Sequence, residues 1–271
     1  GSPPRTPPMP DRRFVLLGLP SLLLPVWSLA DSPQSILFVG NSYFYYNDGL
    51  HHHLKQLLEA AQPQQSRSVV YKSATIGGAR LDHHPIEWLM DPGRMGVTRP
   101  FDVVILAGNS TEALRPASRE RFRQTAIAFD RTIRARGGQT VLYMTPAHVA
   151  PSRHAQPGRQ QDIADMYQSV GQEIDAKVLP VGLAFAESYK RRPDILLHNA
   201  HDGSHPSLYG TYLAACVLLA QLYGLNPIGN TYSAHGQVPH DVMTHLQQVA
   251  WDSASGHRAS AKGTPSQRPL Q

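Results

Sequence analysis

Two stretches of the sequence combine residue types that can carry out nucleophilic catalysis. Ser42 closes the segment Gly40-Asn41-Ser42, which follows an apolar run, and Asp202-Gly-Ser-His205-Pro206 stands late in the chain. A serine hydroxyl attacks a carbonyl at neutral pH only when a positioned base takes its proton. His205 can act as that base, and Asp202 can hold its imidazole in the required tautomer. These residue types could carry out acyl transfer through Ser42, while a turn or helix-cap role is the alternative interpretation of this serine.

The segments around these residues alternate between expected strands and expected helices. Short apolar runs predict five strands, near residues 36–40, 68–72, 102–106, 140–144 and 179–183. The helical spacing of apolar residues predicts helices over residues 49–61, 118–136, 162–177, 184–191, 207–223 and 238–251. Pro63 is the expected end of the first helix, and Ser118 is the expected N-cap of the second. Strands that alternate with helices form parallel units. We therefore expect an α/β fold, a three-layer α/β/α sandwich with a flavodoxin-like, parallel five-stranded sheet of order 2-1-3-4-5.

Ligand sites of such sheets lie beyond the carboxyl ends of the strands, and the residues found there resemble a known superfamily. Segments 40–42, 74–81, 107–111 and 202–207 are similar, in this order, to the four blocks of the SGNH (GDSL-like) hydrolases. The last segment, Asp202-Gly-Ser-His-Pro-Ser207, resembles the branch in which that block precedes a helix of the type G-x-Y-L-A-A-C, and the matching stretch of this sequence runs to Cys216. The resemblance covers residues 36 to about 224.

The resemblance implies a role for each matched residue. Ser42, Asp202 and His205 correspond to the catalytic triad. The oxyanion donors would be the backbone N–H of Ser42, the backbone N–H of Gly78 and the side chain of Asn109, with Gly77 as an alternative to Gly78. Two positions depart from the family pattern. Asn41 replaces the usual aspartate and is expected to brace its loop, and Ser110 replaces the aspartate that usually follows the block-three asparagine.

Residues 1–30 predict an N-terminal extension that ends in a signal peptide. Arg12-Arg13 precede an apolar run, and Ser28-Leu-Ala30 supplies the small residues of a cleavage site. The run is shorter than the roughly 20 residues of a membrane span, so no stable membrane insertion is expected after signal removal. An uncleaved anchor is the alternative. The expected location is periplasmic or secreted, by the Sec or the twin-arginine route. Residues 31–251 would form the hydrolase domain, and residues 252–271 a disordered tail.

Composition limits the remaining classes of function. A length of 271 residues with 41% hydrophobic residues fits one α/β domain. The net charge of +5 includes Arg5, Arg12 and Arg13 near the N-terminus, so no concentrated basic face and no nucleic-acid partner are expected. Cys216 is the single cysteine, which excludes an internal disulfide and a multi-cysteine metal site.

Clustered histidines leave a metal site as an alternative hypothesis. The clusters are His51-His52-His53, His83-His84 and the group His198, His201 and His205. Zinc uses such ligands, but the H-E-x-x-H spacing is missing, and three consecutive helical residues point in different directions. We expect no metal and no cofactor.

The sequence therefore favours an exported serine esterase that acts on a small-molecule or carbohydrate ester, with an O-acetyl carbohydrate as the narrower possibility. A catalytically silent, polysaccharide-binding domain of the same fold and a histidine-dependent metallohydrolase are the alternatives. Intact Ser42, Asp202 and His205 argue against the silent domain.

Overall fold

The centre of the molecule is a parallel sheet. The computed structural model describes residue 1 and residues 32–262, so the expected signal peptide lies outside the described residues. All neighbouring strands pair in parallel, in the order β2-β1-β3-β4-β5. The strands are β1 (Ser35–Gly40), β2 (Val70–Thr75), β3 (Val103–Leu106), β4 (Gln139–Tyr143) and β5 (Lys177–Leu179). The predicted fold class and strand order are confirmed.

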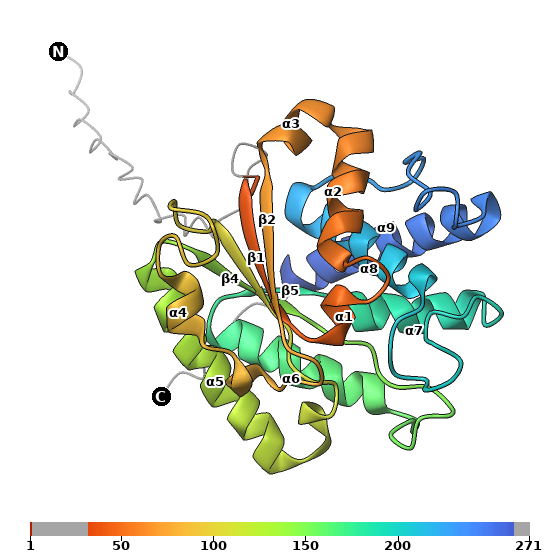
Figure 1. The fold of residues 1–271 in the computed structure, drawn as a ribbon, viewed down its shortest axis with the longest axis horizontal. Helices are drawn as coiled ribbons and strands as arrows, with labels where there is room; N and C mark the ends of the chain where they lie inside the picture. Colours follow the sequence, from red (N-terminus) through yellow and green to blue (C-terminus); the bar gives the residue numbers. More distant parts are fainter. Residues whose placement is uncertain (2–31, 263–271) are drawn as a thin grey trace.

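Helices cover both faces of the sheet and give the molecule its three layers (Figure 1). One face carries α2 (Leu50–Ala61), α7 (Val181–Arg191), α8 (Leu208–Tyr223) and α9 (His240–Lys262). The other face carries α4 (Ile86–Met90), α5 (Pro116–Ala135) and α6 (Arg159–Glu173). Because side chains of a strand alternate between faces, Ile36 and Phe38 join the first core and Leu37 and Val39 join the second.

Helix α8 is apolar on all sides because other elements surround it. It packs against α2, α9 and β5, and all but its first two residues are buried, Cys216 among them. Ser207 caps its N-terminus by accepting a hydrogen bond from the backbone N–H of Gly210 at 3.2 Å. Gly224 ends the helix in the left-handed conformation, with φ of 66°. The Ser207 cap at the N-terminus fixes the point where the segment around His205 enters the helix.

Two predicted boundaries differ because proline sets them. Helix α5 begins at Pro116 with Arg115 as N-cap, so Ser118 lies inside the first turn, where its Oγ donates to the Arg115 carbonyl at 2.9 Å. The fifth strand ends at Leu179, since Pro180 has no N–H to extend the ladder, and Val181 already begins α7.

The prediction of a disordered tail from Asp252 is wrong for residues 252–262. They continue α9, while residues 263–271 lie outside the described part. Asp252 forms an ion pair with Arg191 at 2.7 Å, and the Ala254 carbonyl accepts a hydrogen bond from Gln221 Nε2 at 2.9 Å. Tertiary contacts therefore stabilise a segment whose composition resembles a linker.

Three short helices were not predicted at all. They are α1 (Ser42–Tyr45), α3 (Pro63–Ser68) and α4. Pro63 does follow the end of α2, but it also occupies the first position of α3, where a proline loses no hydrogen bond.

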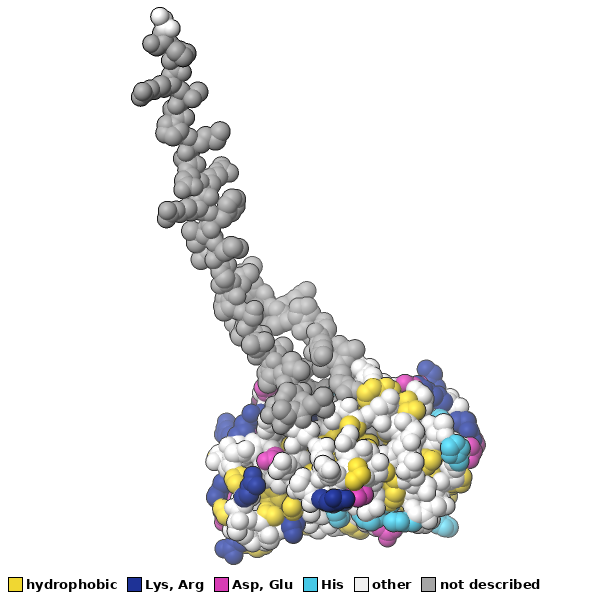
Figure 2. Space-filling model, turned by 90° about the horizontal axis from the view of Figure 1, so that it is seen from above, with side chains coloured by type: hydrophobic (Ala, Val, Ile, Leu, Met, Phe, Trp, Pro, Cys, Tyr) yellow, Lys and Arg dark blue, Asp and Glu magenta, His cyan; other side chains and the backbone are white. Residues whose placement is uncertain are grey.

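The surface shows no single basic region on the face drawn in Figure 2, where Lys and Arg side chains are scattered. Among the described helices, none has the length and apolar character needed to cross a membrane.

Candidate active site

Ser42 lies at the turn between the central strand β1 and helix α1. It is the first residue of the helix and is buried, with an exposed fraction of 6%. Asn41 caps the helix, its Oδ1 accepting from the backbone N–H of Tyr43 at 3.2 Å. A Cβ on Gly40 would stand 2.6 Å from the Phe44 ring, so the close return of the chain over the strand end requires glycine. The turn therefore holds Ser42 at the carboxyl edge of the sheet.

Asn41 also joins the loops that follow the two neighbouring strands. Its Nδ2 donates to the carbonyl of Ala79, after β2, and to the carbonyl of Gly108, after β3, both at 3.1 Å. An ionised aspartate at this position could donate neither hydrogen bond. Asn41 thus provides the brace that the sequence predicted.

The turn between α7 and α8 brings Asp202 and His205 together. Asp202 Oδ2 lies 2.7 Å from His205 Nδ1, and its Oδ1 accepts from the backbone N–H groups of Ser204 at 2.8 Å and His205 at 3.0 Å. Burial alone would raise the pKa of the Asp202 carboxyl, but the hydrogen bonds from the His205 ring and from the two N–H groups lower it to about 2. Asp202 is therefore ionised at neutral pH and orients the imidazole.

The residues after Ser42 hold this turn against helix α1. The Tyr46 ring stacks on the His205 ring, with centroids 4.3 Å apart and planes 6° from parallel. Next to it, Asn47 Nδ2 donates to the Pro206 carbonyl and to Thr211 Oγ1, each at 2.9 Å. Tyr46 stands one helical turn after Ser42, and its backbone N–H donates to the Ser42 carbonyl at 3.1 Å, so the stacking brings the imidazole to the side of α1 that carries the serine. Within the described chain no hydrogen bond joins Ser42 to His205.

The two remaining predicted residues meet across neighbouring loops. Asn109 Nδ2 donates to the carbonyl of Gly78 at 3.1 Å, while its Oδ1 accepts from the N–H and the hydroxyl of Thr111. An amide has two N–H groups, so Asn109 keeps one for a ligand. In the part of the chain that the structure describes, the N–H groups of Ser42 and Gly78 donate to no protein acceptor. The sequence-predicted donors therefore lie at one edge of the sheet.

A buried carboxylate beneath these loops was not predicted from the sequence. Glu112 is 1% exposed, and its Oε2 accepts from the N–H of Asn109 at 2.7 Å and of Leu81 at 3.3 Å. Burial raises the pKa of the Glu112 carboxyl, and the two N–H groups oppose the shift. Glu112 thus links the loop after β2 to the loop after β3.

Comparisons with known proteins bear on the fold. No protein-family model matches the chain, and no curated protein matches its sequence. Among solved structures, a DUF4886 family protein from Bacteroides uniformis superposes with a TM-score of 0.63 at 19% identity, covering 81% of this chain and 93% of that one. A proposed SGNH hydrolase from Slackia heliotrinireducens gives 0.54 at 20% identity, covering 70% and 98%. An acetylxylan esterase from Geobacillus stearothermophilus, solved as a catalytic mutant, gives 0.54 at 16% identity, covering 69% and 93%. The chain has the SGNH hydrolase fold.

Within the SGNH fold of this chain, the histidines of each cluster contact different partners and do not converge on one site. His53 lies between the Tyr232 hydroxyl and the Asn47 carbonyl, whereas His52 Nε2 faces His235 Nε2 at 3.2 Å. His198 is buried beside Tyr189, and His201 is exposed. Among the described residues no three His, Cys, Asp or Glu side chains are arranged to hold a metal ion.

The neighbouring residues His83 and His84 also differ in their surroundings. His84 is buried, and burial lowers the pKa of its imidazole to about 4, with the neighbouring His83 adding to the shift. His83 is exposed, and its Nδ1 accepts from the backbone N–H of Arg80 at 3.3 Å.

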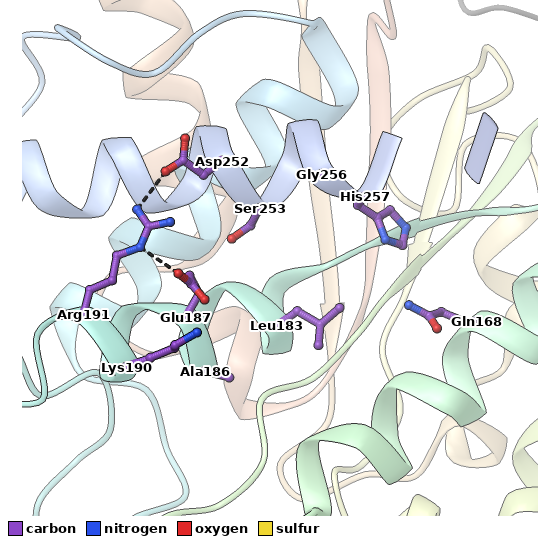
Figure 3. A pocket seen from close by; sticks show the side chains of 10 residues that line it. All are labelled: Gln168, Leu183, Ala186, Glu187, Lys190, Arg191, Asp252, Ser253, Gly256 and His257. Carbon is purple, nitrogen blue, oxygen red and sulfur yellow. Dashed lines mark hydrogen bonds and ion pairs between the residues drawn. The ribbon is translucent and has the colours of Figure 1, made fainter. Parts of the chain in front are cut away.

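A hollow of about 500 Å³ lies away from these residues, between α6, α7 and α9 (Figure 3). Arg191 crosses part of it, pairing with Glu187 at 2.8 Å and with Asp252 at 2.7 Å. None of the predicted site residues lines it. We therefore place the candidate active site at the strand ends and not in this hollow.

Sequence reasoning missed Asn47 and Glu112 as parts of the site, and also His148, whose Nε2 stands 2.6 Å from Ser110 Oγ and 3.1 Å from Ser204 Oγ. His148 follows the end of β4, so the same inspection of strand ends that found Ser42, Gly78 and Asn109 could have found it. For Glu112 the sequence carries no comparable signal.

Proposed function

We propose that this protein is an exported serine esterase that hydrolyses a carboxylic ester through an acyl-Ser42 intermediate. The observation that carries the proposal is the Asp202–His205 pair stacked on Tyr46, one turn after Ser42. Serine acyl transfer requires an imidazole that is held by an ionised carboxylate and can reach the serine hydroxyl, and the Asp202–His205 pair meets the first of these conditions.

The proposed reaction has two steps. His205 Nε2 takes the proton of Ser42 Oγ as the oxygen attacks the ester carbonyl. The resulting oxyanion accepts hydrogen bonds from the N–H of Ser42, the N–H of Gly78 and the free amide hydrogen of Asn109. The intermediate collapses, and the alcohol leaves with the proton held by His205. A water molecule, deprotonated by His205, then releases the acid and restores Ser42. The reaction needs no cofactor.

The substrate that we favour is an acetyl group on a carbohydrate. Tyr45, three residues after the proposed nucleophile, exposes 44% of its surface, and its ring centroid lies 5.5 Å from that of Tyr46. Exposed aromatic rings suit the apolar faces of sugar rings. One structural neighbour is named as an acetylxylan esterase, which supports the same substrate class.

Export rests on the sequence of residues 12–30, and N-terminal sequencing of the secreted protein should find Asp31 first.

The central experiment is labelling with a fluorophosphonate, which reacts with activated serines. We expect one labelled serine, located at Ser42 by peptide mapping, and no labelling in Ser42→Ala. His205→Ala should label far more slowly because the hydroxyl loses its base. Ser35→Ala is a matched control, since Ser35 lies at the opposite end of β1. Reaction at another serine, or full esterase activity in Ser42→Ala, would refute the proposal.

A panel of p-nitrophenyl esters of increasing chain length, each with and without EDTA, separates the alternatives. An acetyl esterase should prefer the shortest ester and retain its activity in EDTA. A silent binding domain would hydrolyse none of the esters, and a metallohydrolase would lose activity in EDTA and regain it with zinc.

A further inference from the structure

His148 contacts both loops that carry the proposed chemistry. It lies on the loop after β4, and its Nε2 stands 2.6 Å from Ser110 Oγ and 3.1 Å from Ser204 Oγ. Ser110 follows Asn109, the proposed oxyanion donor, and Ser204 precedes His205, the proposed base. One imidazole nitrogen therefore joins two segments that are far apart in the sequence.

The other ring nitrogen fixes how this imidazole lies. His148 Nδ1 stands 2.8 Å from Ser152 Oγ, and that oxygen also accepts from the backbone N–H of His154 at 3.2 Å. Burial lowers the pKa of the His148 imidazole to about 4, with the charge of His154 adding to the shift and Asp202 opposing it. The ring is therefore neutral near pH 7. A neutral imidazole has one donor nitrogen and one acceptor nitrogen, which suits a bridge between hydroxyls.

The backbone beside His148 packs against the turn that carries Asp202 and His205. The N–H of Val149 donates to the carbonyl of Gly203 at 2.8 Å. A Cβ on Gly203, whose φ is 61°, would lie 2.0 Å from the Val149 carbonyl oxygen. The loop and the turn thus approach as closely as their backbones permit, and His148 completes this contact with a side-chain hydrogen bond to Ser204.

The network also extends to the segment that contains the proposed nucleophile. The Tyr43 hydroxyl donates to Ser110 Oγ at 3.5 Å, and Tyr43 directly follows Ser42. Tyr43 and Ser110 are both buried, so loss of the hydrogen bond between His148 and Ser110 would leave polar groups poorly satisfied beneath the site. Two of the four segments that resemble SGNH blocks therefore meet at His148, and Ser110 connects them to the residue that follows a third.

We propose that His148 is a positioning residue of the esterase, holding the loop of Asn109 and the turn of Asp202 and His205 in register with each other through Ser110 and Ser204. The inference rests on the proposed function, because the two loops need this register only if they act on the same bound ester. A small displacement of a catalytic group can lower turnover about 100-fold without loss of the fold.

The test compares His148→Leu, which cannot form any of the three side-chain hydrogen bonds of His148, with His148→Gln, which offers both a donor and an acceptor. The kcat for p-nitrophenyl acetate is divided by the number of sites that a fluorophosphonate labels, so that unfolded protein does not count. We expect His148→Leu to lose about 10- to 100-fold in kcat per site with KM within about twofold, and His148→Gln to recover a large part of the loss. His154→Leu, on the same loop, should retain its kcat.

A double-mutant cycle tests whether His148 acts through the serines. Ser110→Ala should lower kcat per site, and adding it to His148→Leu should cost little more than His148→Leu alone, because the shared hydrogen bond is already lost. If His148→Leu does not fold, Ser110→Ala and Ser204→Ala still decide the matter, since each should lower kcat per site several-fold.

Unchanged kcat per site in His148→Leu, or in both serine variants, would overturn the role of His148. Strict additivity of His148→Leu and Ser110→Ala would do the same. If Ser42→Ala is inactive in parallel, only the inference about His148 fails. Full activity in Ser42→Ala would overturn the proposed function and this inference together.

Discussion

Replacing Asp202 by asparagine should stop His205 from acting as the base while leaving the turn in place. The aspartate makes two kinds of contact: Oδ1 accepts from two backbone N–H groups, and Oδ2 faces His205 Nδ1 at 2.7 Å. The asparagine oxygen can keep the backbone contacts, which places its NH₂ group against Nδ1. An NH₂ group can only donate, so Nδ1 must become the acceptor and the proton moves to Nε2. A protonated Nε2 cannot take the proton of Ser42.

The size of the loss follows from the partners of the imidazole. Among the described residues Asp202 is the one hydrogen-bond acceptor of His205 Nδ1, so no carbonyl can restore the tautomer. The same exchange in a serine protease triad costs about 10⁴ in kcat, and we expect about 10³–10⁴ for Asp202→Asn. That corresponds to about 4–5 kcal/mol of transition-state stabilisation. The free energy of unfolding should change by less than about 1 kcal/mol, since the Asp202 side chain is 38% exposed and solvent screens its charge.

The assay is kcat for p-nitrophenyl acetate at pH 7–8, together with thermal unfolding of each variant. Asp194→Asn is the matched control, because Asp194 lies between α7 and α8 as well but pairs with Arg192 at the surface. A loss below about tenfold in a folded Asp202→Asn protein would refute the argument, since another group would then be holding the imidazole.

Two further substitutions test the loops around the site. Asn109→Ala should lower kcat by about 10²–10³ as an oxyanion donor is lost, and its three side-chain hydrogen bonds predict a lower melting temperature as well; an unchanged kcat would exclude it as a donor. Gly203→Ala should destabilise the protein far more than Gly229→Ala in thermal unfolding. Both glycines have positive φ, but only at Gly203 would the added Cβ collide, with the Val149 carbonyl; equal melting temperatures would contradict this expectation.

The strands and their order could be predicted because each central strand is a short apolar run. Val103–Leu106 is buried along its whole length, as expected for a strand covered on both faces. The helices α1 and α3 could not be predicted, since four to six residues leave no room for a hydrophobic period. The end of α9 depends on contacts with Arg191 and Gln221, which are distant in the sequence.

The candidate site also has parts that could be predicted and parts that could not. Local sequence predicts that Asp202 and His205 share one turn, and the positions after the strands predict that Ser42 and Asn109 lie at one edge of the sheet. The contact that connects the two groups is long-range, because Tyr46 meets His205 only after α1 and α8 have packed on the sheet. Such contacts carry no signal in a single sequence, because the spacing between partners has no period.

The surroundings of the histidines at this edge explain why His205 fits the role of base better than its neighbours. Both ring nitrogens of His148 contact serine hydroxyls, and both nitrogens of His53 face a tyrosine or a carbonyl. His84 has a buried nitrogen without a protein partner, but among the described residues no carboxylate hydrogen-bonds its ring. His205 alone in this group combines an aspartate on Nδ1 with an Nε2 that contacts no protein acceptor in the described chain. A base must have one nitrogen held and the other available, and only His205 of these four meets both conditions.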